Sequence, residues 1–301
     1  MKVLGIDFTS TPRRRKPITC VSGRLDGGKL TVDAVESVET LDGFEALLGR
    51  PGPWIAGCDF PFGQARRLVE NIGWPRDWAG YVEHVGTLSR AGFREALDAY
   101  RAPRPTGDRE HRRATDIAAG AISPQKLHGV PVALMFHEGA PRLRRAGVTV
   151  PGLQSGDPGR IVVEAYPGVL ARCLIGRRSY KNDVRSRQSS AQRDARQSLI
   201  DSLSGDAVRS THGIGVTFAD DEPSATSAAF VDDPMADRLD AVLCAVQAAW
   251  AWERRDERFG EPPDTDPLEG WIADPTLGRP PASAGPMRNP ASPPRNGERD
   301  G

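Results

Sequence analysis

Cysteine is scarce in this sequence. The four that occur in 301 residues, Cys20, Cys58, Cys173 and Cys244, are isolated and form no CxxC motif. Their spacing argues against a zinc site, and a small oxidised scaffold would need a denser set. We therefore expect buried free thiols in a reducing cytoplasm.

Long apolar runs are also missing. No stretch approaches the roughly 20 apolar residues that a membrane-spanning helix requires. The first residues lack the basic segment and apolar run of a secretory signal. We expect a soluble, cytoplasmic protein with no membrane partner. The 38% hydrophobic content is enough for the core of one large domain, or of one domain with insertions.

Neither sign of charge is in excess, because Lys+Arg and Asp+Glu both number 40. A nucleic-acid-binding protein often carries a basic field, and none is evident overall. Basic stretches occur locally at 13–16, 109–113 and 142–145. Such stretches follow a phosphate backbone in some proteins and form ordinary solvated surface in others. The total charge therefore does not decide whether nucleic acid is a partner.

Short apolar segments separated by turn signals predict an α/β domain. Four strands are expected early in the chain, at 2–7, 17–23, 29–38 and 54–58. The tight-turn sequence Asp26-Gly27-Gly28 joins the second strand to the third. A short helix is expected at 41–48, before Gly49 and Pro51. The fourth strand would then pair parallel to the first, which gives a mixed sheet.

A fifth strand is expected at 160–164, and the clearest helix of the chain at 235–254. In that helix Leu239, Leu243, Val246 and Trp250 recur at three- and four-residue spacing. Further helices are expected at 65–72, 78–85, 92–100 and 169–175, and one that reaches residue 203.

The domain organisation follows from these elements. A mixed five-stranded sheet flanked by helices would occupy residues 1–258. We expect residues 64–158 to form an Arg-rich helical insertion that caps the sheet, in which 101–113 is an exposed loop or helix edge. Residues 259–301 are Pro-rich, and their composition predicts a largely disordered tail, although 268–272 is apolar enough to dock.

Acidic residues stand where the predicted strands end. Asp7 ends the first strand, Asp59 follows the fourth, Glu164 ends the fifth, and Asp237 and Asp240 lie near the start of the long helix. Parallel strands present their carboxyl ends at one edge of a sheet, about 5 Å apart, so their acids are able to share a cation. Gathered carboxylates repel one another unless a hard cation such as Mg²⁺ or Mn²⁺ neutralises them. Two such ions about 4 Å apart hydrolyse phosphodiesters in known enzymes.

Each acid also has a simpler interpretation. Asp7 and Asp59 would serve as turn residues or caps, and Glu164 as an exposed loop acid. Asp237 and Asp240 are favoured by the helix dipole in any case. The five acids in this order are more specific than any one of them.

Several sequence blocks resemble a known family. They are GIDFTST (5–11), GCDFPFG (57–63), EAYPGVLAR (164–172), SYKND (179–183) and DRLDAVLCAVQAAWAW (237–252). Over about residues 1–255 they are similar to domain-of-unknown-function family 429, described as a predicted nuclease with a ribonuclease H-like fold. The resemblance extends distantly to Holliday-junction resolvases, whose acids occupy the first strand, the fourth strand and a late helix. It implies Asp7, Asp59 and Asp240 as catalytic metal ligands, and Glu164 as a fourth.

Weaker candidates surround these acids. Lys126 in SPQKLHG and Lys181 in SYKND would contact substrate phosphate, although a surface lysine is the default interpretation. His111, close in sequence to Asp116, would act as a general base or acid.

The leading hypothesis is therefore a metal-dependent nuclease that hydrolyses phosphodiester bonds. A second hypothesis is a non-catalytic ribonuclease H-like binding scaffold whose acids are caps. A third, weaker one is an ATP-binding phosphotransferase, because GIDFTST also resembles the first phosphate loop of sugar kinases and actin-like ATPases. The chain has no GxxxxGK[ST] motif and no convincing second phosphate loop.

Overall fold

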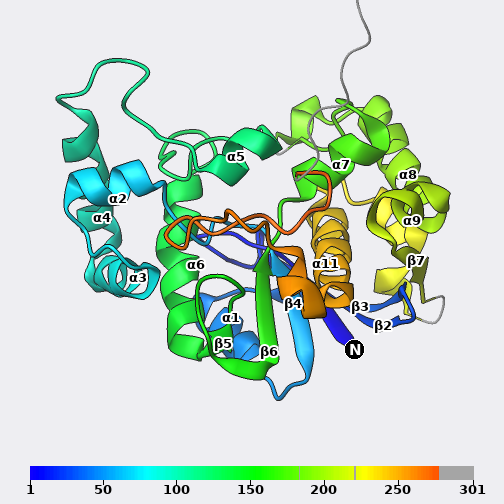
Figure 1. The fold of residues 1–301 in the computed structure, drawn as a ribbon. Helices are drawn as coiled ribbons and strands as arrows, with labels where there is room; N and C mark the ends of the chain where they lie inside the picture. The colour runs from blue at the N-terminus through cyan, green and yellow to red at the C-terminus, as the bar shows by residue number, and fades with distance from the viewer. Residues whose placement is uncertain (183, 220–221, 278–301) are drawn as a thin grey trace, which may run out of the picture.

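One mixed sheet of seven strands organises the molecule (Figure 1). The computed structural model describes residues 1–182, 184–219 and 222–277. The sheet has the order β5-β6-β4-β1-β2-β3-β7. Its strands are β1 (Lys2–Asp7), β2 (Ile18–Asp26), β3 (Lys29–Val38), β4 (Trp54–Cys58), β5 (Val148–Thr149), β6 (Asp157–Glu164) and β7 (Gly215–Phe218).

The pairing of the central strands agrees with the sequence. Strands β1, β2 and β3 are antiparallel neighbours, and β4 runs parallel to β1, as expected. Strand β6 continues the parallel side next to β4. The expected number of five strands is wrong, because β5 and β7 extend the sheet at its two edges. Both strands are short, and β7 pairs with β3, which lies far away in the chain. No local sequence pattern therefore predicts them.

Helices cover both faces of the sheet. They are α1 (Leu41–Leu48), α2 (Arg66–Ile72), α3 (Trp78–Thr87), α4 (Arg90–Arg101), α5 (Ala114–Ala119), α6 (Val132–Ala146), α7 (Pro167–Ile175), α8 (Ser190–Ser204), α9 (Asp206–His212), α10 (Ser227–Val231) and α11 (Asp237–Glu253). One apolar core joins α7, α8, α10 and α11 to one face of the sheet, and another joins α1 and α6 to the opposite face.

The segment between β4 and β6 builds a third apolar cluster, shared by α2, α3, α4 and α6. The predicted helices of this segment are found as α2, α3 and α4. Helix α6 has no counterpart among the predicted helices. Its pattern is broken by Gly139 and by Pro141, which cannot donate a backbone hydrogen bond but lies buried inside the helix.

Two glycines allow α11 to lie directly on the sheet. Gly5 of β1 and Gly57 of β4 are register partners in neighbouring strands. A Cβ atom at Gly5 would lie 1.9 Å from the carbonyl oxygen of Ala241, and one at Gly57 would lie 2.3 Å from that of Cys244. Glycine inside a strand is typical of such close backbone approach. The pair therefore sets where α11 crosses β1 and β4.

We expect Gly5→Ala to destabilise the protein by about 3 kcal/mol, because the added methyl group forces the backbone of α11 off the sheet. Chemical denaturation measures the free energy of unfolding. Gly49→Ala is the matched control, since a Cβ atom there meets only ordinary contacts of 3.5 Å or more and the backbone φ is −79°. Its stability should stay within about 1 kcal/mol of wild type. Equal stability of the two variants would refute this account of the helix position.

The segment after α11 returns to the domain. Leu268, Trp271, Ile272 and Ala273 are buried, and the backbone N–H of Ala273 donates to the carbonyl oxygen of Glu164 at 2.8 Å. The docking expected for 268–272 is thus found. Residues 278–301, which make up much of the expected tail, lie outside the described residues.

Within residues 1–182, 184–219 and 222–277, none of the helices combines the length and apolar character needed to cross a bilayer.

Candidate active site

Asp7 and Asp59 lie side by side at the carboxyl ends of β1 and β4. Ile6 and Cys58 are register partners, and the backbone N–H of Asp59 donates to the carbonyl oxygen of Ile6 at 2.9 Å. Side chains alternate between the two faces of a strand, so Asp7 follows Gly5 and Asp59 follows Gly57 on the face that α11 covers. The two predicted acids therefore share one edge and one face of the sheet.

Helix α11 brings two more acids to the same place. Asp240 lies in the first turn, just before the residue that touches Gly5, and is fully buried. The hydroxyl group of Tyr180 donates to one of its carboxylate oxygens at 2.6 Å, and the Lys181 ammonium group donates to the other. Asp237, one turn earlier, accepts from the Lys16 ammonium group at 2.9 Å. The acids of α11 thus have partners within the protein.

Asp7, Asp59, Asp237 and Asp240 form an acidic cluster, and burial and like charge dominate its electrostatics. Burial and the charge of Asp240 raise the pKa of Asp7 well above its ordinary value, and the same causes raise the pKa of Asp59 to about 7. Lys181 opposes both shifts. Among the described residues, no hydrogen bond reaches the carboxylate of Asp7 or Asp59. Negative charge at these two side chains is therefore not fully compensated.

Lys181 is the cation whose charge opposes the pKa shifts of both Asp7 and Asp59. Burial lowers its pKa, but the negative charge of Asp240 outweighs burial, so the pKa lies well above its ordinary value. Lys181 is thus firmly protonated. The sequence offered Lys181 as a phosphate contact, and the structure gives it an acid of the cluster as partner. Tyr180, its neighbour in SYKND, is a site residue that the sequence reasoning missed.

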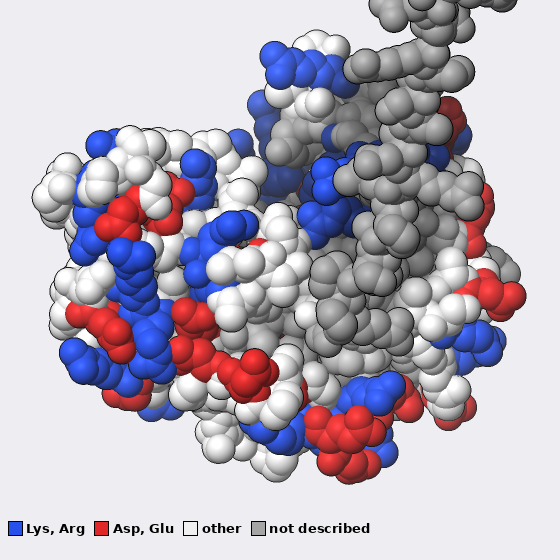
Figure 2. Space-filling view, turned by 45° about the horizontal axis from the view of Figure 1, so that its top comes forward, with Lys and Arg blue, Asp and Glu red and all other residues white. Residues whose placement is uncertain are grey.

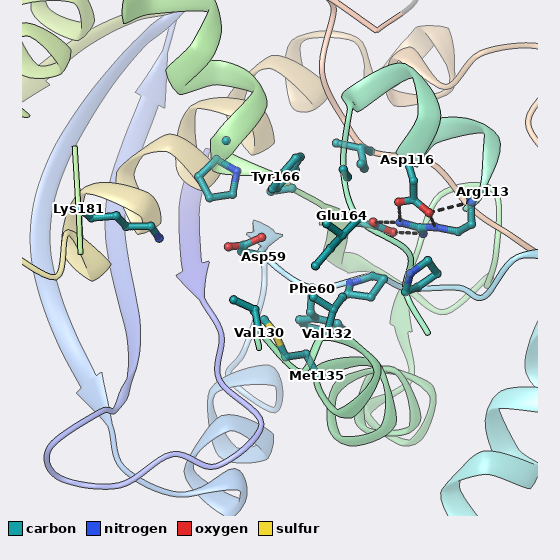
Figure 3. A pocket seen from close by; sticks show the side chains of 18 of the residues that line it. Asp59, Phe60, Arg113, Asp116, Val130, Val132, Met135, Glu164, Tyr166 and Lys181 are labelled. Atoms are coloured by element: carbon teal, nitrogen blue, oxygen red, sulfur yellow. Dashed lines mark hydrogen bonds and ion pairs between the residues drawn. The ribbon is translucent and has the colours of Figure 1, made fainter. Parts of the chain in front are cut away.

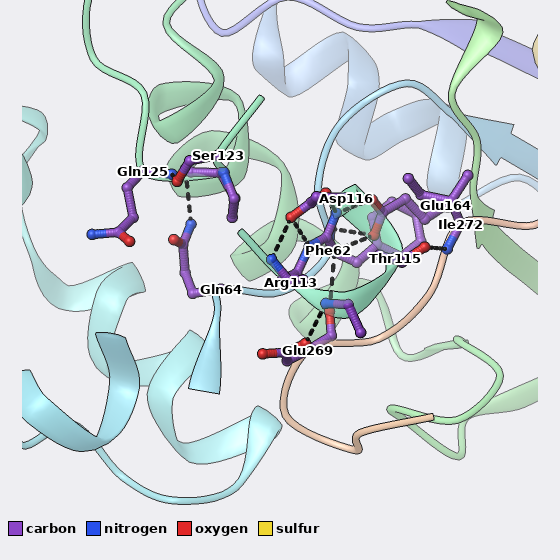
Figure 4. A network of polar contacts seen from close by, with 12 residues as sticks. Phe62, Gln64, Arg113, Thr115, Asp116, Ser123, Gln125, Glu164, Glu269 and Ile272 are labelled. Atoms are coloured by element: carbon purple, nitrogen blue, oxygen red, sulfur yellow. Dashed lines mark hydrogen bonds and ion pairs between the residues drawn. The ribbon is translucent and has the colours of Figure 1, made fainter. Parts of the chain in front are cut away.

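Glu164 ends β6 as predicted but faces the other way. It pairs in register with Cys58 rather than with Asp59, so the alternation of side chains turns it away from the face that carries Asp7. Its carboxylate accepts from the backbone N–H of Phe62 at 2.8 Å and twice from the guanidinium of Arg113, at 2.6 and 2.8 Å (Figure 4). Burial raises the pKa of Glu164, and Arg113 opposes that rise. Glu164 therefore belongs to a separate ion-pair network.

Arg113 is the centre of that network. Its side chain is 1% exposed and also forms bonds of 2.7 and 3.0 Å to the carboxylate of Asp116. It donates in addition to the carbonyl oxygen of Glu269 at 3.1 Å, which ties the C-terminal segment to the network (Figure 4). The sequence placed Arg113 in an exposed loop or helix edge, and the expected exposure is wrong, because the side chain is buried and two carboxylates compensate its charge.

A cavity of about 320 Å³ adjoins both groups. Asp59 and Lys181 lie toward one part of it, and the network of Arg113, Asp116 and Glu164 lies toward another (Figure 3). Much of the remaining lining is apolar and comes from the end of β4, from the segment leading into α6 and from the turn before α7. Of the acids gathered by β1, β4 and α11, Asp59 is the one that lines this pocket.

Two other predicted site residues are placed differently. The ring of His111 is largely buried and its Nε2 lies 2.6 Å from the hydroxyl group of Tyr100, while burial lowers its pKa. Lys126 lies 3.8 Å from a carboxylate oxygen of Glu110. Neither residue lines the cavity. The structure does not bring them to the acidic cluster.

Whether the acidic cluster fits a metal ion depends on how many ligands the protein has to supply. Among the described residues, no three carboxylate, thiol or imidazole groups are arranged so that they could hold one ion together. Mg²⁺, however, is usually bound by one or two carboxylates, with water and substrate phosphate as the other ligands. Asp7 and Asp59, two adjacent carboxylates without other partners, fit that smaller requirement.

Comparison with known proteins gives a family and no closer relative. No curated protein and no solved structure matches the sequence. Residues 5–265 match the family described as a protein of unknown function (DUF429). The match includes Asp7, Asp59, Lys181 and Asp240 and spans all seven strands except the first residues of β1. The chain belongs to the DUF429 family.

Proposed function

We propose that this DUF429 protein is a metal-dependent nuclease that hydrolyses phosphodiester bonds. The observation that carries the proposal is the pair Asp7 and Asp59, which lie at the ends of adjacent parallel strands with incompletely compensated negative charge. Asp59 also lines the cavity. Such a pair costs stability, and a divalent cation removes the repulsion. Carboxyl groups whose pKa values are shifted in this way are common at functional sites.

The fold supports the proposal at a coarser level. Three antiparallel strands, a helix and a strand parallel to the first are the arrangement that the ribonuclease H-like resemblance implies. We propose that the domain is ribonuclease H-like on this ground. Acids at the end of β1, just after β4 and at the start of a late helix occupy the positions that the resolvase resemblance implies.

Asp7 and Asp59 would hold one Mg²⁺ or Mn²⁺ ion. The bound ion would supply a Lewis acid for a phosphate oxygen. Asp240 plays a different part, because Tyr180 and Lys181 occupy both of its oxygens. It holds the ammonium group of Lys181 beside the two free carboxylates, where that group is able to pair with a substrate phosphate. Asp237 lies one turn earlier in α11, is bound to Lys16 and has no direct part.

The mixed charge of the surface implies that nucleic acid would contact the protein mainly at the site itself. On the face shown in Figure 2, outside the grey atoms, Lys and Arg side chains are intermixed with Asp and Glu. No broad basic field is present there to attract nucleic acid from a distance. Binding would rest on groups at the site, such as Lys181, and we expect it to weaken only moderately with salt.

The test is a metal titration followed by a cleavage screen. We expect millimolar Mg²⁺ or Mn²⁺ to raise the midpoint of thermal unfolding of wild type above that in EDTA, since an ion that binds only the folded state stabilises it. Labelled single-stranded DNA, RNA and branched DNA should then be cut in Mn²⁺ and remain intact in EDTA. No metal response and no cleavage together would refute the proposal.

One observation favours a second candidate, the non-catalytic scaffold. Lys16 and Lys181 already pair with Asp237 and Asp240, so part of the cluster is neutralised within the protein. A scaffold predicts no stabilisation by metal and binding without cleavage. The phosphotransferase gains no such support, because Arg90 donates to the hydroxyl oxygens of Ser10 and Thr11 in the GIDFTST loop at 3.2 and 3.1 Å.

A further inference from the structure

The cavity beside the acidic cluster has no part in the chemistry described so far. Its volume of about 320 Å³ lies near the lower end of the range for small-ligand pockets. Asp59, Tyr180 and Lys181 contribute to its lining, so it is continuous with the acids. The space suits one compact group attached to the reacting phosphate rather than a folded length of strand.

On the wall of the cavity away from Asp59 and Lys181, the polar side chains are already occupied by one another. The guanidinium of Arg113 donates to Asp116, Glu164 and the carbonyl oxygen of Glu269. Both carboxylates are bound to it in return through both of their oxygens. A ligand would therefore find few free side-chain hydrogen-bonding groups on this wall. Recognition at this wall has to rest on shape and apolar contact.

The apolar groups that line the cavity are suited to a flat ring. Phe60, Val132 and Met135 lie together in the lining, and Tyr166 contributes an aromatic ring (Figure 3). Stacking on an aromatic side chain or packing against aliphatic groups stabilises a bound flat ring, whatever hydrogen-bonding groups its edge carries.

The mouth of the cavity is apolar and open to solvent. Ile122 is 49% exposed and Val130 is 57% exposed, and both belong to the lining. Among the described residues only four large hydrophobic side chains are exposed to this degree, and the other two are Ile117 and Val184. Two of the four therefore gather at one opening, which core packing does not explain.

We propose that the cavity binds a single unstacked nucleobase of the substrate strand, next to the phosphodiester at Asp7 and Asp59. The proposal rests on the proposed nuclease function and names its substrate class. A base inside a duplex cannot enter such a pocket without leaving the stack, and the cost is least for single strands, loops and mismatches. The protein should therefore act on unpaired nucleotides, with little preference among the four bases.

Binding of a fluorescein-labelled single-stranded octanucleotide tests this directly. The titration is done in Ca²⁺, which is able to neutralise the carboxylates, and a gel run afterwards checks that the probe is intact. A series of probes carries one abasic position, moved along the strand. We expect one position, or two adjacent ones, at which removal of the base weakens binding about tenfold, and little effect elsewhere.

Variants at the mouth locate the base. The double variant Ile122→Gln/Val130→Gln should lose most of the difference between intact and abasic probes, because polar groups replace the apolar rim. Both side chains are exposed, so folding should be unaffected, which circular dichroism verifies. The control Ile117→Gln changes a side chain that is 59% exposed and does not line the cavity, and it should behave as wild type.

Each other outcome has a definite meaning. If intact and abasic probes bind equally, the base pocket is refuted, while the nuclease proposal stands on its own test. If a base-specific loss survives in the double variant, the base binds elsewhere and this proposal fails. If no probe binds in Ca²⁺, the base pocket is refuted as well, and the nuclease proposal is decided separately by the metal titration and the cleavage screen.

Discussion

Arg113→Met is expected to destabilise the protein by about 3–5 kcal/mol, among the largest losses for any single substitution in this chain. The guanidinium is 1% exposed and is the common partner of Asp116 and Glu164, which are also buried. Removal of one member of a buried ion pair leaves the remaining charge without compensation, and here two carboxylates are left. Chemical denaturation measures the loss, and a partly unfolded product at 25 °C would agree with it.

Two controls separate this effect from the loss of any arginine. Arg67→Met removes a side chain that is 62% exposed and pairs with Asp108 at 2.7 Å, and it should cost no more than about 1 kcal/mol. The triple variant Arg113→Met/Asp116→Asn/Glu164→Gln removes the two carboxylate charges as well and should recover a large part of the stability. A loss for Arg113→Met as small as that for Arg67→Met would contradict the buried network.

The double variant Asp7→Asn/Asp59→Asn is expected to lose cleavage by about 100-fold or more, because it removes both proposed ligands of the ion. It should also lose the rise in unfolding midpoint on addition of Mn²⁺. The variant should nevertheless fold, since asparagine keeps the shape of each side chain and removes buried like charges. Cleavage assays and thermal unfolding in EDTA and in Mn²⁺ measure the two effects.

We also expect the stability difference between the double variant and wild type, measured in EDTA, to depend on pH. The pKa of Asp59 is about 7 in the folded protein, above its ordinary value of 3.8. Between these values the folded state binds more protons than the unfolded state, so wild-type stability falls as pH rises from about 4 to about 7. The asparagine variant has no such loss. Its stability relative to wild type should therefore grow by about 2 kcal/mol over that range, after allowance for the partial exposure of Asp59.

A double variant that is unfolded at pH 7 would remove the basis for the like-charge argument. One that still gains stability from Mn²⁺ as wild type does would place the ion elsewhere. Arg24→Gln/Asp33→Asn, an exposed pair on β2 and β3, serves as a control that should change neither the metal response nor the slope with pH.

Local sequence was sufficient for the central strands and for the long helix. Strands β1, β3 and β4 begin and end at the expected residues. β1 and β4 are short apolar runs, and β3 mixes apolar and polar residues after the Asp26-Gly27-Gly28 turn. Helix α11 lies within the expected range, because its apolar spacing spans many turns. The same local signals placed Asp7 and Asp59 at strand ends. Those two positions follow from the sequence once parallel pairing is assumed.

The sequence also contains a signal for the position of α11 on the sheet. GID and GCD each place a glycine two residues before the acid, on the same face of the strand. A glycine at that position in two paired strands is a signal for close approach of a helix.

Tertiary structure alone decided which acids work together. Glu164 ends its strand as Asp7 does, yet the β4–β6 register pairs it with Cys58, and one residue of offset turns a side chain to the other face. Arg113 and Lys181 reach their acids from segments far away in the chain. Local patterns report backbone conformation, whereas register, charge pairing and the cavity depend on packing between distant segments. The sequence by itself thus determined the central strands, the long helix and the positions of Asp7 and Asp59 at strand ends. The folded structure determined the edge strands, helix α6 and the partners of the acids.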